Sequence, residues 1–216
     1  LETSKPKGLI DLTVKGFCDE LSSDSPAPGG GSVAALCASL AASLGAMVTN
    51  LTYGKKGYED YFSRMSELGK KLQSQKQSFV VDIDKDTDSF NDLMTAFKLP
   101  KKSDEEKKIR LQAIEKATQA ATLSPLNIME KTQNIIQDLI EIAEKGNQNS
   151  LSDAGVALLN ARAAIEGAYM NVLINLAGIT DNQFKESVSQ KSMNIHQETI
   201  KNIEQEAINH TPSQTQ

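Results

Sequence analysis

Four acidic residues fall within seven positions of one helical segment, and acids in such a setting can move protons. The run is VDIDKDTD, residues 81–88. Asp86 follows Ile83 by three residues and precedes Phe90 by four, so the helical repeat places it within an apolar stripe. A carboxylate on an apolar face is costly to ionise, which raises its pKa and suits it to acid–base chemistry. Asp86 is therefore our candidate catalytic residue; the alternative is a surface acid paired with a neighbouring Lys or Arg.

The other acids of this run have different expected positions. Asp82 lies one turn before Asp86 and shares part of its face, where a like charge would raise the pKa of Asp86 further. Asp84 and Asp88 are expected to project roughly opposite, towards solvent.

A glycine-rich segment, PAPGGGS, stands directly before an uncharged helical segment. Gly29, Gly30 and Gly31 allow the backbone to approach a ligand, and the free N–H groups of a helix start attract anions. The segment is neither a Walker motif, because no Gly-Lys-Ser/Thr follows, nor a Rossmann fingerprint, because no strand precedes it. It predicts an anion-binding loop or, alternatively, a hinge in which Ser32 caps the helix.

Other polar residues are weaker candidates. Lys55 and Lys56 end a stretch without acids or other lysines and arginines, so they could meet an anionic ligand or lie on plain surface. Asn171 and Asn175 lie one turn apart on an otherwise apolar helix, and buried amides need partners. We favour a role in bridging helices over a role in binding a ligand.

The composition argues against several classes of protein. The 216 residues carry a net charge of −5, whereas a nucleic-acid binder would present a net basic face. Two cysteines cannot make a disulfide framework, so a reducing, cytoplasmic location is expected. The two histidines, His196 and His210, match no zinc or Ser-His-Asp spacing, so no metal site is expected.

Helical periodicity dominates the chain, and strand patterns are nearly absent. The predicted helices are a short one capped by Asp11, an Ala-rich one over 33–48, a long one over about 58–97, two separated at Pro125 over about 103–122 and 125–145, one over about 153–177, and a last one over about 180–207. The Ala-rich helix is apolar all round, which indicates a core helix packed on every side, with a second subunit as one possible neighbour. A membrane span is disfavoured, because Ser, Thr and Asn interrupt it and bulky apolar residues are few.

These patterns predict an all-α fold, a multi-helix bundle with a central Ala-rich helix and one long helix. The length suits one domain, which we place at 9–208, with a tail or linker at 1–8 and a frayed tail at 209–216. Because the chain begins at Leu1 rather than Met, we expect a piece of a longer protein, either a domain cut away from an upstream domain or a trimmed single-domain protein.

Three segments resemble the cyclodeaminase domain of the formiminotransferase-cyclodeaminase family. They are PAPGGGSVAALCASLAASLGAMVTNLTYGKK, DKDTDSFNDLMTAFKLPKK and GNQNSLSDAGVALLNARAAIEGAYMNVLINLAGITD, and they occur in the family's order between about Phe17 and Phe184. The family also includes stand-alone methenyltetrahydrofolate cyclohydrolases. The TYGKK and ITDNQF segments look closer to the bifunctional enzyme.

The resemblance implies an all-helical homodimer or higher homo-oligomer, with a formiminotransferase fused to it or separate. It implies a lyase of histidine degradation and one-carbon metabolism, which converts 5-formiminotetrahydrofolate to 5,10-methenyltetrahydrofolate with loss of ammonia. No metal or redox cofactor is expected, since the folate is the substrate. The family's acid–base residue is the second Asp of the D-x-D before the Phe, and it falls on Asp86, with Asp84 matching the first Asp.

Folate carries an anionic glutamate tail, so the resemblance also implies an anion site, for which the glycine-rich helix start is our first candidate. The substrate-binding residues that we assign lie in that loop and in the matching segments: Gly29, Gly30, Gly31, Ser32, Asp84, Lys55, Lys56, Asn147 and Asp153.

Two alternatives stay open. A methenyltetrahydrofolate cyclohydrolase would use the same folate slot and one acid–base residue to hydrate the methenyl bridge. A non-catalytic helical interaction domain would bind no reduced folate. In every case, neither a nucleic acid nor a membrane is expected as a partner.

Overall fold

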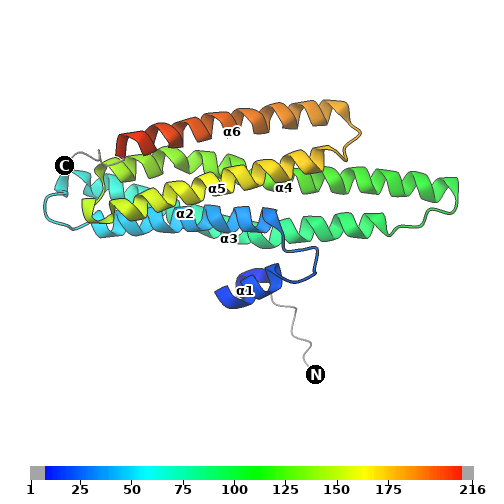
Figure 1. Cartoon of the computed structure of the whole chain (residues 1–216), viewed down its shortest axis with the longest axis horizontal. Coiled ribbons are helices and arrows are strands. Elements are labelled where there is room, and N and C mark those ends of the chain that lie inside the picture. Colours follow the sequence, from blue (N-terminus) through cyan, green and yellow to red (C-terminus); the bar gives the residue numbers. More distant parts are fainter. Residues whose placement is uncertain (1–7, 211–216) are drawn as a thin grey trace, which may run out of the picture.

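The computed structural model describes residues 8–210, with side chains described through Gln205, and the regular structure of this part of the chain is helical throughout. Five long helices, α2–α6, form an elongated bundle, and the short α1 stands off one side of it (Figure 1). The all-α prediction is confirmed. The α-helices are α1 (Val14–Leu21), α2 (Gly30–Thr52), α3 (Phe62–Phe97), α4 (Asp104–Lys145), α5 (Leu151–Leu176) and α6 (Asn182–His210).

Three one-turn 3₁₀ helices, at Leu9–Asp11, Glu59–Tyr61 and Gln148–Ser150, precede α1, α3 and α5. The predicted tails at 1–8 and 209–216 fall mostly outside the described residues, so they stay predictions.

The Ala-rich helix α2 lies at the centre of the bundle, in contact with α3, α4 and α5 (Figure 1). Its buried alanines allow neighbouring helices to approach closely, and at Gly45 even a methyl group would overlap Leu72 of α3 and Leu139 of α4. By length and composition α2 could cross a membrane, but 61% of its most apolar window is buried inside the structure. The prediction of a central helix is confirmed, but one face of α2 is not covered within the described part of this chain, because Leu40, Met47 and Leu51 are exposed there.

The predicted helix break at Pro125 is wrong, because α4 runs without interruption from Asp104 to Lys145. A proline inside a helix leaves the carbonyl four residues earlier without its hydrogen bond. Here that carbonyl belongs to Ala121, and the side-chain amide of Asn175 on α5 donates to it at 2.8 Å. The neighbouring helix thus satisfies the freed group, and Asn175 bridges helices as predicted.

The helix starts agree with the sequence prediction at one position and differ at two. The Ser103–Glu106 capping box of α4 is present, with each side chain accepting from the other's backbone N–H. Thr13, rather than Asp11, caps α1, and its hydroxyl accepts from the N–H of Gly16 at 3.0 Å. At α2 the cap is Gly29, so Ser32 lies inside the first turn and not at the cap.

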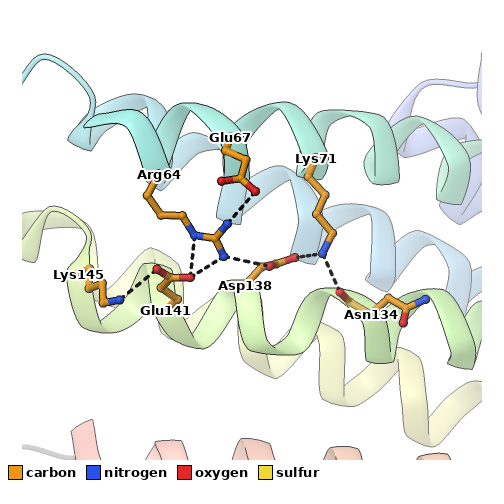
Figure 2. A network of polar contacts seen from close by, with 7 residues as sticks. All are labelled: Arg64, Glu67, Lys71, Asn134, Asp138, Glu141 and Lys145. Atoms are coloured by element: carbon orange, nitrogen blue, oxygen red, sulfur yellow. Dashed lines mark hydrogen bonds and ion pairs between the residues drawn. The ribbon is translucent and has the colours of Figure 1, made fainter. Parts of the chain in front are cut away.

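Ion pairs join α3 to α4 at two levels of the bundle. Near the start of α3, Arg64 binds Glu141 at 2.8 Å, and Lys71 binds Asp138 at 2.6 Å (Figure 2). Further along α3, Asp82 is only 2% exposed. Lys131 of α4 binds its carboxylate at 2.7 Å and also donates to Ser78, so this buried charge has a cation of its own.

We expect Lys131→Met to lower the free energy of unfolding by about 2–4 kcal/mol, because it leaves the buried Asp82 carboxylate without its closest cation. Lys107→Met is the matched control, since Lys107 forms an exposed pair with Asp104, and it should cost less than about 0.5 kcal/mol. Urea denaturation of both variants measures the difference. Equal losses would show that the Asp82 pair does not hold α3 to α4.

Candidate functional site

The start of α2 meets the second half of α3, and this junction holds Asp86. The backbone of Gly31 lies so close to the Asp86 carboxyl that a methyl group at Gly31 would overlap both of its oxygens. Asp86 itself is half-buried, whereas Asp88, two residues further along α3, is exposed. Gly31 is therefore needed for close approach between the loop and the acid.

Ser32, which follows Gly31 in the first turn of α2, connects α2 to α3 through its hydroxyl. The residue is fully buried. Its Oγ lies 3.1 Å from the carbonyl oxygen of Ile83, 3.3 Å from Oδ2 of Asp86 and 3.1 Å from Oγ1 of Thr87. The first turn of α2 thus holds the acid through hydrogen bonds as well as through close packing.

The surroundings of Asp86 favour its protonated form. Burial raises the pKa of the carboxyl, while hydrogen bonds from the side chain and backbone of Ser32 lower it and offset part of the rise. A carboxyl with a raised pKa can both hold and release a proton closer to neutral pH, which a general acid–base requires.

Asn171 of α5 lies against the same loop. A side chain at Gly30 would place its Cβ 3.1 Å from the Asn171 amide nitrogen, which donates to the carbonyl of Gly167 at 2.8 Å. The amide therefore bonds within its own helix and borders the loop, rather than bridging two helices. The sequence pattern indicated a buried amide here but gave no sign that α5 brings it to the glycine loop.

Asp84 does not project into solvent, contrary to expectation. It is half-buried, and its Oδ1 accepts a hydrogen bond from the backbone N–H of Leu9 at 2.8 Å. The carboxyl thereby holds the segment before α1 against α3. The helical period placed Asp84 away from the bundle correctly, but no pattern in the sequence indicated that the N-terminal segment returns to cover it.

Lys55, Lys56, Asn147 and Asp153 lie at the opposite end of α2 from the glycine loop. The 23 residues of α2 span about 34 Å, so these residues do not join Asp86 within one chain. Lys55 donates to the side-chain oxygen of Asn147, whose backbone N–H donates to Thr52. The predicted substrate-binding set is therefore divided into two clusters.

Lys56 and Asp153 are the other two predicted residues at this end of α2. Lys56 is exposed, and Asp153 is half-buried in the first turn of α5. Among the side chains that the structure describes, no group of three or more His, Cys, Asp or Glu could hold a metal ion.

Comparison with known proteins identifies relatives of known activity. Residues 13–194 match the family model described as formiminotransferase-cyclodeaminase. The methenyltetrahydrofolate cyclohydrolase of Methylorubrum extorquens is 41% identical over 175 residues, which cover 81% of this chain and 84% of that protein.

The formimidoyltransferase-cyclodeaminase of Gallus gallus is 39% identical over 184 residues, which cover 85% of this chain but 34% of that protein. The chain thus spans about a third of the bifunctional relatives. The crystal structure of formiminotetrahydrofolate cyclodeaminase from Thermotoga maritima superposes with a TM-score of 0.79 at 27% identity, covering 92% of this chain and 97% of that one.

We expect Gly31→Ala to destabilise the fold by about 1–3 kcal/mol, because the new methyl group must displace the Asp86 carboxyl. Gly29→Ala is a control two residues earlier, where an added Cβ meets nothing within 4 Å, so its effect should be limited to the poorer helix cap that alanine makes, about 0.5–1 kcal/mol. Thermal and urea unfolding compare the two variants. Equal losses of stability in the two variants would show that any side chain in this segment is destabilising, so that the contact between Gly31 and Asp86 is not the cause.

Proposed function

Because the chain belongs to the formiminotransferase-cyclodeaminase family, an enzyme family of folate one-carbon metabolism, we propose that it is a formiminotetrahydrofolate cyclodeaminase. It would convert 5-formiminotetrahydrofolate to 5,10-methenyltetrahydrofolate and release ammonia. The observation that supports this most directly is the half-buried Asp86, held against the start of α2 with a raised pKa.

The reaction needs one group that both accepts and donates a proton. N10 of the folate attacks the amidine carbon carried by N5, and it must lose its proton as the new bond forms. Ammonia then leaves the tetrahedral intermediate, and the departing nitrogen must first gain a proton. A single carboxyl of raised pKa can take the first proton and deliver one to the leaving nitrogen. Asp86 is the residue that we assign to both steps.

The main alternative is a methenyltetrahydrofolate cyclohydrolase, which the 41% identity to the Methylorubrum enzyme supports. In that reaction Asp86 would accept a proton from water as it adds to the methenyl carbon. The two activities are separated by supplying each substrate in turn to the purified protein. Ammonia and 5,10-methenyltetrahydrofolate formed from 5-formiminotetrahydrofolate support the cyclodeaminase. Hydrolysis of methenyltetrahydrofolate above the spontaneous rate, with no ammonia from the formimino substrate, would assign the cyclohydrolase instead.

We expect Asp86→Asn to lower kcat by about 10²–10⁴, the usual effect of removing a general acid–base, with KM little changed. Asp88→Asn is the matched control, because Asp88 is an exposed acid on the same helix and should keep wild-type turnover. Steady-state kinetics test both variants. Near-normal turnover of Asp86→Asn would show that another group carries the proton.

The same substitution has an expected effect on stability. The pKa of Asp86 is raised on folding, so the native state binds this proton more tightly than the unfolded chain. Its contribution to stability is present below about pH 4 and is lost as the pH rises through the folded pKa. Asp86→Asn should therefore gain stability relative to wild type across that range, as measured by urea unfolding at several pH values.

We also propose that the enzyme is a homodimer formed through α2 and α5. Along α2, partly or fully exposed apolar residues recur at alternating steps of four and three, the spacing of a helix–helix seam: Val33, Cys37, Leu40, Leu44, Met47 and Leu51. The adjoining α5 exposes a second apolar row, which includes Leu159, Met170 and Ile174. An exposed apolar face of this extent marks an interaction surface.

A two-fold axis across α2 would set the two copies antiparallel, with each glycine loop beside the partner's Lys55 end. Such a dimer would join the two clusters of predicted substrate-binding residues into one site, with the lysines available to the folate tail. A formiminotransferase, fused or separate, is the expected source of the substrate.

In this arrangement Leu40, near the middle of α2, faces its own copy, so Leu40→Asp should bring two like charges together and give monomers. Leu111→Asp is the control, because Leu111 is also exposed but lies on α4 away from this face. Sedimentation velocity distinguishes the outcomes. A wild-type monomer, or a Leu40→Asp protein that stays dimeric, would contradict the α2 interface.

A further inference from the structure

The hydroxyl of Ser32 has more possible hydrogen-bond partners than it can serve with one proton. Its Oγ lies within 3.3 Å of the Ile83 carbonyl, the Asp86 carboxyl and the Thr87 hydroxyl. The Ile83 carbonyl can only accept, and so can Asp86 when it is ionised. Thr87 is therefore the group that can donate to Ser32, which leaves the single Ser32 proton to be directed to either Ile83 or Asp86.

The choice between these two acceptors depends on the charge of Asp86. When the carboxyl is ionised, the Ser32 proton is drawn to it, because hydrogen bonds to charged acceptors are the stronger ones. When the carboxyl is protonated, the Ser32 proton can turn back to the Ile83 carbonyl. In both states Thr87 keeps its bond to Ser32, and no buried hydroxyl is left without a partner.

Charged groups near the junction are bound elsewhere. α2 carries no Asp, Glu, Lys or Arg between Gly30 and Thr52. On α3 itself, Asp82 is paired with Lys131, and Asp84 accepts from the N–H of Leu9. α5 presents the uncharged amide of Asn171 to the loop. The hydrogen bonds that act on the Asp86 carboxyl come from Ser32.

We propose that Ser32 and Thr87 are positioning residues, a pair of hydroxyls that holds the Asp86 carboxyl in place and redirects one proton as Asp86 gains and loses its own. Ser32 then acts through Asp86 rather than by touching the folate, because it is fully buried and its oxygen is surrounded by protein acceptors and donors. Thr87 donates to Ser32 in both states and so leaves the Ser32 proton available to Ile83 or Asp86.

Thr87→Val tests this pair, because valine keeps the shape of threonine and removes its hydroxyl. The consequence for catalysis rests on the proposed function of Asp86, and we expect kcat to fall about tenfold with KM within about twofold, the effect of weakening one hydrogen bond to a charged group. The pKa that governs kcat should rise, since the ionised carboxyl loses support. Thr87→Ser, which restores a hydroxyl, should recover most of the lost rate.

A second measurement is independent of any activity. In protein labelled with ¹³C at its aspartate carboxyls, the Asp86 signal is identified by its absence from Asp86→Asn, and its titration gives the pKa directly. We expect a higher value in Thr87→Val and a value near wild type in Thr87→Ser. An unchanged titration in Thr87→Val overturns the proposed pair, as does equal loss of kcat in the valine and serine variants. A shifted titration in a protein without cyclodeaminase activity would instead retain the pair and reject the proposed function.

Discussion

The close approach between the first turn of α2 and Asp86 is the constraint on which the rest of the structure depends. A half-buried carboxyl can lie against backbone only where no side chain intervenes, and Gly31 provides that space. The approach also fixes where α2 crosses α3, so it requires small residues further along α2 if the other helices are to pack around it. The buried alanines and Gly45 meet that requirement. The composition of α2 thus follows from the geometry of the site as much as from the needs of a core.

A helix with so few large side chains buries little apolar surface of its own, and the longer side chains of its neighbours fill the remaining volume. Leu72 and Phe79 of α3 and Ile135 and Leu139 of α4 are all fully or almost fully buried. Ion pairs between α3 and α4 select one register of the two helices, because the paired side chains meet only in that register. Figure 2 shows the pairs formed by Arg64 and Lys71. The apolar core and the polar contacts therefore fix the position of α3, and with it the position of Asp86.

The sequence allowed the helical class, the central helix and the half-buried position of Asp86 to be predicted, because each depends on local periodicity. It could not place features that depend on pairing between distant segments. Pro125 alone predicts a helix break, which is wrong because Asn175 on α5 donates to the carbonyl that the proline leaves free. The helical period predicts that Asp84 is a surface acid, but it accepts a hydrogen bond from the N–H of Leu9 in the N-terminal segment. We expected Lys55 and the glycine-rich segment to contribute to one anion site, but they lie at opposite ends of α2.

Two acids one turn apart on α3 show how surroundings separate a structural group from a reactive one. Asp82 is almost completely buried and forms an ion pair with Lys131, which ties α3 to α4. Asp86 is less buried, and its hydrogen bonds come from the neutral Ser32, while burial raises its pKa. A cation would fix the carboxyl in its ionised form, whereas a hydroxyl can support either form, since it can donate or turn away. For a group that must change its protonation state during a reaction, the neutral partner is the more suitable one.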